Sequence, residues 1–260
     1  MAGGSTHWQG RSVISKVVCL LDAFATDAPE LSLGDLARIT GLPVSTTYRL
    51  ATELVDWGGL ERADGAGYRI GMRMWELGAL AARGVTLRDV ALPFMQDLYE
   101  ATHENVHLAV RDHLEALYVD TIAGRESVPV RSRRGGRLPL HATGVGKVLL
   151  AHAPPEVLAA VLEAGLRRYT PYTVVTPGHL RRALADVRRT GVAFAREEMS
   201  LGSASVAAPV VGEDGTVVAA LAVVRRSGSV DLRRLALAVR TAAISTSRAL
   251  QQSGRLVTIR

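Results

Sequence analysis

The sequence predicts an α+β protein in two folded parts, an N-terminal winged helix-turn-helix and a larger mixed domain, joined by a linker helix. Two observations support this fold class. Two short helical patterns, separated by a glycine turn and followed by a hairpin pattern, occupy the first part of the chain. Further along, segments with strand-like alternation mix with helical segments. The boundaries that we expect are a disordered extension at 1–10, the winged helix-turn-helix at 11–72, the linker helix at 73–86 and the mixed domain at 87–253.

Composition is typical of a globular protein of the cytoplasm. Of the 260 residues 48% are hydrophobic, which suffices for one large core or two smaller ones. No stretch reaches the roughly 18 uninterrupted apolar residues of a membrane helix, and the N-terminus lacks the pattern of a secretion signal. The single cysteine, Cys19, excludes an internal disulfide, and we expect it to be a buried apolar side chain.

Charge is spread unevenly along the chain. The net charge is +6, yet residues 1–83 hold 8 basic and 9 acidic side chains, so the positive excess falls in residues 84–260. Overall charge therefore does not locate a DNA-binding face in the first part. Such a face has to be argued from the positions of individual arginines.

Three helices are predicted before the hairpin. The first covers 12–24, and the second runs from a capping-box-like pair, Ser32 and Asp35, to a terminal glycine, Gly41. The third covers 43–57, and the short glycine-containing turn before it is typical of a helix-turn-helix. The apolar positions that we expect to face inward are Val13, Val17, Leu20, Leu21, Phe24, Leu36, Ile39, Val44, Tyr48, Leu50, Leu54 and Val55.

The N-terminal end of the third helix is suited to DNA. Ser45, Thr46 and Thr47 are small hydroxyl side chains that can approach phosphates and base edges, and Arg49 is a long bidentate donor. A helix-turn-helix places the N-terminal residues of its second helix in the major groove. The alternative for Ser45 is a plain N-cap.

A hairpin pattern follows, with strands around 60–62 and 68–70 and a turn at 64–67. A helix-turn-helix followed by such a hairpin is a winged helix, whose wing would offer Arg62 and Arg69 to the DNA backbone or minor groove. The alternative is a surface hairpin with solvated arginines. We favour double-stranded DNA as the partner, because helices, cap, turn and wing occur in the right order.

The linker pattern consists of a helix, a break at Gly84 and Thr86, and a second helix. An apolar face on an exposed linker needs a partner, so one hypothesis is contact between two copies of the chain. The alternative is packing against Val13 and Leu20 of the same chain. The residues of this apolar face are Met72, Trp75, Leu77 and Leu80.

The stretch HENVHLAVRDH at 103–113 resembles the H-E-x-x-H motif of zinc proteases. Such a site needs its two histidines one turn apart on a helix. The local pattern instead alternates through 105–122, which predicts a β-hairpin, and the glycine of the longer protease motif is replaced by Val110. We therefore expect no metal and no catalytic residue. The alternative, a zinc-dependent hydrolase, would use His103, Glu104 and His107, with His113 as a third ligand.

A helix is predicted to begin near Thr143. Its free N–H groups and positive dipole end could hold a small anion at Thr143, Gly144 or Val145, and the alternative is an ordinary threonine N-cap. The remaining pattern mixes helices and antiparallel hairpins, which indicates an α+β sensor domain. The other predicted segments are helices at 154–166, 176–191 and 231–250, and strands at 192–197, 204–212 and 216–224.

Several stretches resemble the IclR family of bacterial transcription regulators. In the first part the resemblance lies in LSLGDLARITGLPVSTTYRLATELVDWGGLER and GYRIG. RLPLHATGVGKVLLA, YTPYTVVTP, VRRTGVAFAREE and SVAAPVVGEDGTVVAALAVV follow in the family's order, so the resemblance spans roughly 11–250. It implies a winged helix, a linker helix and a GAF-like effector-binding domain, assembled as a homodimer or a dimer of dimers.

The resemblance also implies an effector site. In family members that bind small organic acids, the site uses a helix start, an acidic residue, a cysteine and two serines. Most of these polar anchors are apolar here, which predicts a larger, partly apolar effector, such as an aromatic acid or an amino-acid-related metabolite. The alternative is a vestigial pocket without a ligand. Carried over in that order, the positions are Thr143, Gly144 and Val145, then Ala195, then Ser205, then Ala222 and Val224.

The function expected from all this is transcriptional regulation controlled by a small-molecule effector, with no enzymatic activity and no cofactor. Two-fold symmetry predicts a near-palindromic operator. Two rivals remain at this point: the zinc hydrolase, and a sensor protein whose winged helix does not bind DNA. Only the near-neutral first part favours the second rival.

Overall fold

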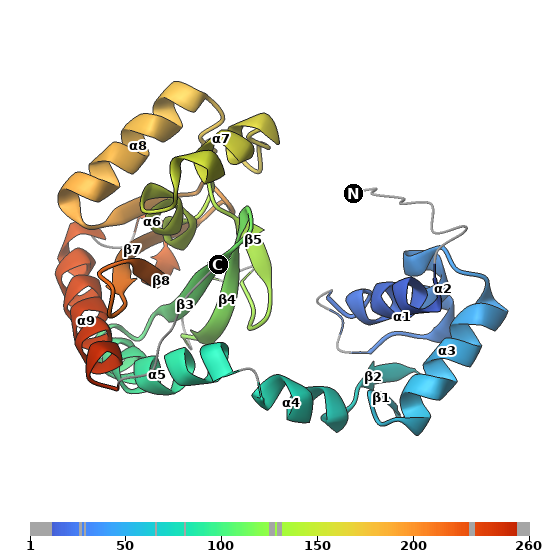
Figure 1. Cartoon of the computed structure of the whole chain (residues 1–260). Helices are drawn as coiled ribbons and strands as arrows, with labels where there is room; N and C mark the ends of the chain where they lie inside the picture. The colour runs from blue at the N-terminus through green and yellow to red at the C-terminus, as the bar shows by residue number, and fades with distance from the viewer. Residues whose placement is uncertain are drawn as a thin grey trace. The chain divides into compact units, whose positions relative to one another are not determined.

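The computed structural model divides the chain into two compact units, Met1–Ala82 and Arg83–Arg260 (Figure 1). The extension predicted at 1–10 lies outside the described residues. No helix within the described parts combines the length and apolar character that a bilayer crossing requires. The structure describes residues 12–25, 28, 30–65, 67–80, 82–124, 128, 132–228 and 232–253, without the side chains of 82–86.

The first unit is a winged helix-turn-helix, as predicted. The two strands β1 and β2 form an antiparallel hairpin, here called the wing, in which Leu60 lies opposite Ile70. A core of leucines, Phe24 and the fully buried Tyr68 joins the helices to this hairpin. The elements are α1 (Val13–Asp22), α2 (Leu33–Thr40), α3 (Val44–Asp56), β1 (Leu60–Arg62), β2 (Tyr68–Ile70) and α4 (Met72–Ala79).

The ends of α2 are set by the two local signals in the sequence. The Ser32 hydroxyl accepts a hydrogen bond from the Asp35 N–H at 3.1 Å and donates one to the Asp35 carboxylate at 2.7 Å. At the other end Gly41 has a φ of 69°, a left-handed conformation that glycine adopts without strain. The predicted capping box and terminal glycine are both confirmed.

Four of the side chains predicted to face inward are exposed. The buried face of α3 is formed by Thr47, Leu50, Ala51 and Leu54. Val44 and Tyr48 lie outside this face. Cys19, expected to be buried, is half-buried. The exposed four are Val13, Ile39, Val44 and Tyr48, with exposed fractions between 40% and 57%.

The predicted break in the linker is wrong in position. α4 ends at Ala79, α5 runs from Ala82 to Thr102, and Gly84 and Thr86 both lie inside α5. The alternative of packing against α1 is not supported, because the core cluster that contains Leu20 includes no residue of α4, and Val13 is exposed. α4 buries none of its residues, and the exposed members of its apolar face are Met72, Trp75, Leu77 and Leu80.

The second unit is built on one antiparallel sheet in the order β5-β4-β3-β8-β7-β6. The α+β fold is confirmed. The short strand β5 was not predicted from the sequence. The strands are β3 (Asn105–Asp112), β4 (Glu115–Ile122), β5 (Arg137–Pro139), β6 (Ala193–Arg196), β7 (Ser203–Val211) and β8 (Val217–Arg226). The helices are α5 (Ala82–Thr102), α6 (Gly144–Ala151), α7 (Pro155–Glu163), α8 (Pro177–Thr190) and α9 (Leu232–Gln252).

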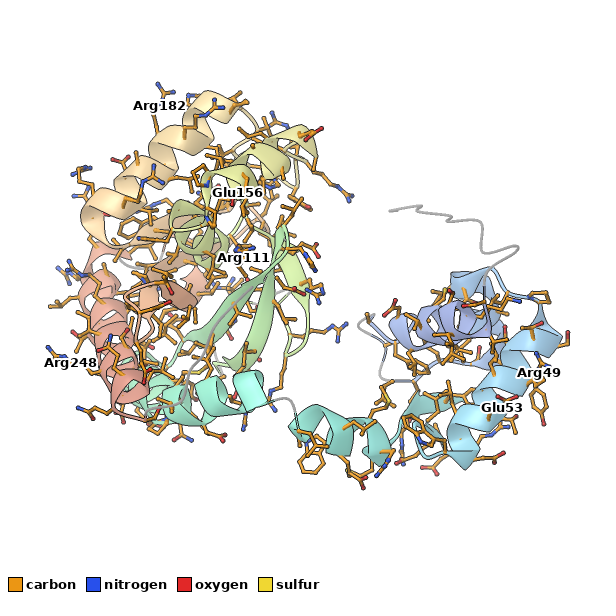
Figure 2. The ribbon with its side chains drawn as sticks, viewed as in Figure 1. Arg49, Glu53, Arg111, Glu156, Arg182 and Arg248 are labelled. Atoms are coloured by element: carbon orange, nitrogen blue, oxygen red, sulfur yellow. The ribbon has the colours of Figure 1, made fainter. Side chains whose placement is uncertain are left out.

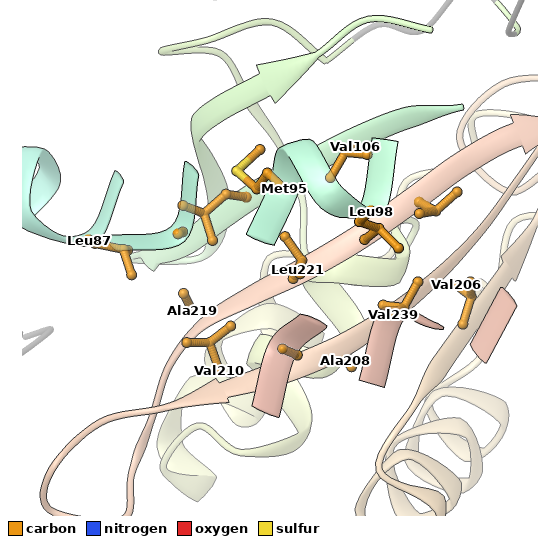
Figure 3. Close-up of a cluster of buried hydrophobic side chains, with 14 of the residues drawn as sticks. Leu87, Met95, Leu98, Val106, Val206, Ala208, Val210, Ala219, Leu221 and Val239 are labelled. Carbon is orange, nitrogen blue, oxygen red and sulfur yellow. The ribbon is translucent and has the colours of Figure 1, made fainter. Parts of the chain in front are cut away.

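Helices cover both faces of this sheet, and each face has its own core. Alternation along β8 sends Leu221 to one face and Ala220 and Ala222 to the other. α5 and α9 pack on the first face (Figure 3), and α6, α7 and α8 pack on the second. The side chains labelled in Figure 3 are Leu87, Met95, Leu98, Val106, Val206, Ala208, Val210, Ala219, Leu221 and Val239.

A buried carboxylate ties α5 to the sheet. Asp120 on β4 is only 1% exposed, and its two oxygens face two arginines from different segments. Arg88 of α5 lies 2.7 Å from Oδ2, and Arg134 of the loop before β5 donates from Nε to Oδ1 at 2.9 Å. Two cations therefore compensate this buried charge.

Candidate functional site

The outer face of α3 is the candidate DNA-binding surface. Ser45 and Arg49 are exposed and Thr46 is half-buried. Thr47 was predicted to face DNA, and this is wrong: it is fully buried and its hydroxyl donates to the Pro43 carbonyl at 3.1 Å. Ser45 is also not the N-cap, since that position is taken by Pro43.

Two side chains of this outer face were missed in the sequence. Val44 and Tyr48 stand beside Ser45 and Arg49 at helical spacing, and both are exposed. Arg49 and Glu53, one turn apart, also project from this face (Figure 2). The face therefore offers a cation, a carboxylate, an aromatic ring, an apolar side chain and hydroxyl groups to a partner.

The two arginines of the wing are already engaged. The guanidinium of Arg62 lies 4.4 Å from the centroid of the Tyr68 ring, and Arg69 donates from Nε to Glu61 at 3.0 Å. The Met72 N–H donates to the other Glu61 oxygen at 3.0 Å. This backbone hydrogen bond and Arg69 together lower the pKa of Glu61. Arg69 can contact a phosphate only in competition with Glu61.

The histidine motif does not form a zinc site. α5 ends at Thr102, His107 lies within β3, and the side chain of His113 is 93% exposed in the turn after that strand. The two histidines of the motif therefore sit on different elements, and the predicted β-hairpin is confirmed. Within the described ranges, no three His, Cys, Asp or Glu side chains are grouped to hold a metal ion.

A cavity of about 520 Å³, part of it open to solvent, lies between the start of α6 and the sheet. We call it the α6 cavity. All seven positions implied by the resemblance line it, namely Thr143, Gly144, Val145, Ala195, Ser205, Ala222 and Val224. The rest of its lining consists of His107, Tyr118, Ser132, Leu138, Ala142, Glu197, Glu198, Met199, Ser200, Ser203 and Ala204.

The N-terminus of α6 combines a cap with two open donors. The Thr143 hydroxyl accepts from the Gly146 N–H and donates to the Pro139 carbonyl, both at 3.1 Å, so Thr143 is an N-cap. Among the described residues, no group accepts from the N–H of Gly144 or Val145. A Cβ at Gly144 would lie 2.7 Å from the Ser205 Oγ, so a larger residue there would require the Ser205 side chain to shift.

A buried ion pair lies under the same helix start. Lys147 and Glu198 are 3% and 8% exposed, and their charged ends are in direct contact. The Lys147 ammonium also donates to the Phe194 carbonyl at 3.3 Å. The pair cancels its own charge, so the two open N–H groups remain the electropositive feature of this end of the cavity.

His107 is a cavity residue that was considered in the sequence only as a zinc ligand. Its Nε2 lies 3.0 Å from the Ser132 hydroxyl, and its ring meets Tyr118 edge-on with centroids 5.4 Å apart. Burial lowers the pKa of His107 to about 4, so the ring is neutral at pH 7. Alternation along β3 predicts that His107 and Val106 point to opposite faces of the sheet. The sequence does not show which of the two faces carries a cavity.

A winged helix followed by a cavity-bearing α+β unit defines a class: DNA-binding transcription regulators that sense a small molecule. The chain belongs to the IclR family. Residues 13–64 match the IclR helix-turn-helix domain, and residues 79–248 match the family described as bacterial transcriptional regulator IclR C-terminal.

Curated relatives and solved structures agree. The chain is 33% identical to the HTH-type transcriptional regulator XynR of Escherichia coli over 225 residues, which are 86% of this chain and 89% of that one. It is 33% identical to the transcriptional repressor IclR of Escherichia coli over 208 residues, 78% and 76% of the two chains.

Among solved structures, an IclR homolog from Microbacterium hydrocarbonoxydans complexed with 4-hydroxybenzoate superimposes with a TM-score of 0.87 at 36% identity. The match covers 93% of this chain and all of that one. The Thermotoga maritima IclR gives 0.75 at 28% identity, covering 92% and 98%. The chain is therefore a DNA-binding transcriptional regulator with an effector-binding C-terminal domain, and neither rival is supported.

Proposed function

We propose that this chain is an effector-controlled repressor that binds its operator through the outer face of α3 and the wing. The DNA-contacting residues are Ser45, Thr46, Arg49 and Arg62. Tyr48 contacts DNA in place of the buried Thr47, and Arg69 does so once it is released from Glu61. It works in the cytoplasm, where bacterial operators lie, and it uses no cofactor and catalyses no reaction. The exposed apolar face of α4 supports assembly as a homodimer or a dimer of dimers.

The effector that we propose is a carboxylic acid with an aromatic body. One observation carries this proposal: two N–H groups without an acceptor among the described residues face one end of a cavity in which three of the implied effector positions are apolar. A helix N-terminus binds carboxylates, and Ala195, Ala222 and Val224 provide contact for hydrocarbon in place of hydrogen bonds. The 4-hydroxybenzoate found in the similar Microbacterium structure supports the same ligand class.

Calorimetry on the full chain tests the ligand class. 4-Hydroxybenzoate is expected to bind at least about tenfold more tightly than glyoxylate, because a ring buries apolar area that a two-carbon acid lacks. 4-Hydroxybenzamide, which keeps the ring and the para hydroxyl but lacks the negative charge, is the matched control and is expected to bind weakly. Tighter binding of glyoxylate, or equal binding of 4-hydroxybenzamide, would contradict the proposal.

Arg49→Ala is expected to weaken binding to the operator by about 1–3 kcal/mol if the guanidinium contacts a base edge. Fluorescence anisotropy with the DNA upstream of the protein's own gene, in the presence of random competitor, measures this loss. Arg182→Ala removes the same charge from α8 (Figure 2) and serves as the control. An equal loss on operator and random DNA would mean that Arg49 contacts phosphate alone.

A further inference from the structure

We propose that His107 and Ser132 are the specificity-determining pair of the α6 cavity, and that they bind a second hydrogen-bonding group of the effector at the end opposite its carboxylate. The inference rests on the proposed function, because it concerns the same cavity. It assigns a role to a histidine and a loop serine that do not belong to the positions implied by the family resemblance.

His107 and Ser132 can together form one more good hydrogen bond than they form with each other. His107 is 3% exposed and lines the cavity together with Ser132. The Ser132 Oγ lies 3.0 Å from Nε2 and 3.5 Å from Nδ1 of the same ring. One hydroxyl cannot serve both ring nitrogens well, and 3.5 Å lies beyond the usual range of such hydrogen bonds. One nitrogen of a buried ring is thus left with a poor partner.

A neutral imidazole has one donor and one acceptor nitrogen. Burial holds the pKa of His107 near 4, so this is the form present at neutral pH. A ligand hydroxyl or amino group can bond to the ring and to the Ser132 hydroxyl at once. A ligand that places a methyl group there leaves one nitrogen of the buried ring poorly satisfied, which is the basis of discrimination.

The position of the pair fixes where the second polar group must be. His107 lies directly opposite Ala222, and Ser205, under the start of α6, lies opposite Val224. The strand order β3-β8-β7 therefore separates the two polar ends by two strand spacings, about 10 Å between backbones.

Tyr118 provides an aromatic contact at the His107 end of the cavity. Its ring meets His107 edge-on with centroids 5.4 Å apart, and both residues line the cavity. A benzene ring with a carboxylate at one end and a hydroxyl or amino group in the para position carries its two polar groups at opposite ends, as this arrangement requires.

The test compares two acids of equal length, 4-hydroxybenzoate and 4-methylbenzoate, by calorimetry on the full chain. The wild type is expected to prefer the hydroxyl compound by about tenfold or more, the worth of one buried hydrogen bond. Ser132→Ala and His107→Phe are each expected to lose most of this preference. Ser203→Ala is the matched control, since it removes a cavity hydroxyl that already donates to the Ser200 carbonyl, and it is expected to keep the preference.

The outcomes separate the two proposals. If the wild type binds both acids equally, or if both variants keep the wild-type preference, the role of His107 and Ser132 is wrong while the aromatic-acid proposal stands. If neither acid binds the wild type, both proposals fall. Near-ultraviolet circular dichroism confirms that each variant is folded, and Ser132→Ala, a loop substitution, gives a result even if His107→Phe does not fold.

Discussion

Glu198→Ala is expected to lower the free energy of unfolding of the C-terminal unit by about 3–5 kcal/mol. Among the described residues, the substitution leaves the Lys147 ammonium, which is 3% exposed, with the Phe194 carbonyl as its remaining hydrogen-bond acceptor. An ammonium in that position is poorly solvated and uncompensated. Urea denaturation followed by far-ultraviolet circular dichroism measures the loss.

Tryptophan fluorescence gives this experiment an internal control. Trp8, Trp57 and Trp75 all belong to the first unit, so their transition is expected to keep its wild-type midpoint. The double variant Lys147→Met with Glu198→Leu removes both charges and is expected to cost much less than Glu198→Ala alone. A loss below about 1 kcal/mol for the single variant would contradict the uncompensated-charge argument.

Acid is expected to destabilise the same unit through His107, by about 3 kcal/mol between pH 7 and pH 4. Burial lowers the pKa of His107 from 6.5 to about 4, so the unfolded chain binds a proton there before the folded chain does. The stabilisation is complete above pH 6.5 and is lost progressively as the pH falls towards 4. His141, whose pKa burial also lowers, contributes in the same direction.

The variant His107→Gln separates the contribution of His107 to the pH dependence from that of His141. Glutamine can keep a hydrogen bond to Ser132 but does not titrate, so the variant is expected to retain only the shallower slope due to the remaining groups. The measurement is the free energy of unfolding from urea titrations at several pH values, again with tryptophan fluorescence for the first unit. Equal slopes for wild type and variant would show that His107 is not the group protonated on unfolding.

Local signals in the sequence were sufficient to predict the helices of the first unit. They were not sufficient to predict which side chains of α3 are buried. Ser32 with Asp35 and the terminal Gly41 set α2 through contacts within a few residues, so they could be predicted. Thr47 and Tyr48 are adjacent on α3, and both fit an amphipathic pattern. Which of them turns inward depends on the position of the neighbouring helices, and the sequence alone assigned both to the wrong side.

The α6 cavity shows the same limit. Its helix start was predicted because Thr143 is a local cap, and its other expected positions came from the resemblance. His107 and Ser132 are in contact although they are 25 residues apart in the sequence. No local pattern predicts a contact between a strand and a distant loop. The break between α4 and α5 was misplaced for a similar reason, since Gly84 and Thr86 are tolerated within a helix whose later turns are packed against the sheet.

The buried carboxylate of Asp120 joins the loop at the cavity to α5. Arg134 stands two residues after Ser132, which borders the cavity, and Arg88 stands on α5, which continues from the linker. Any rearrangement of the cavity loop that displaces Arg134 must either carry α5 along or deprive a carboxylate that is 1% exposed of one of its two cations. Asp120 is therefore a shared contact between the loop that borders the cavity and the helix that continues from the linker.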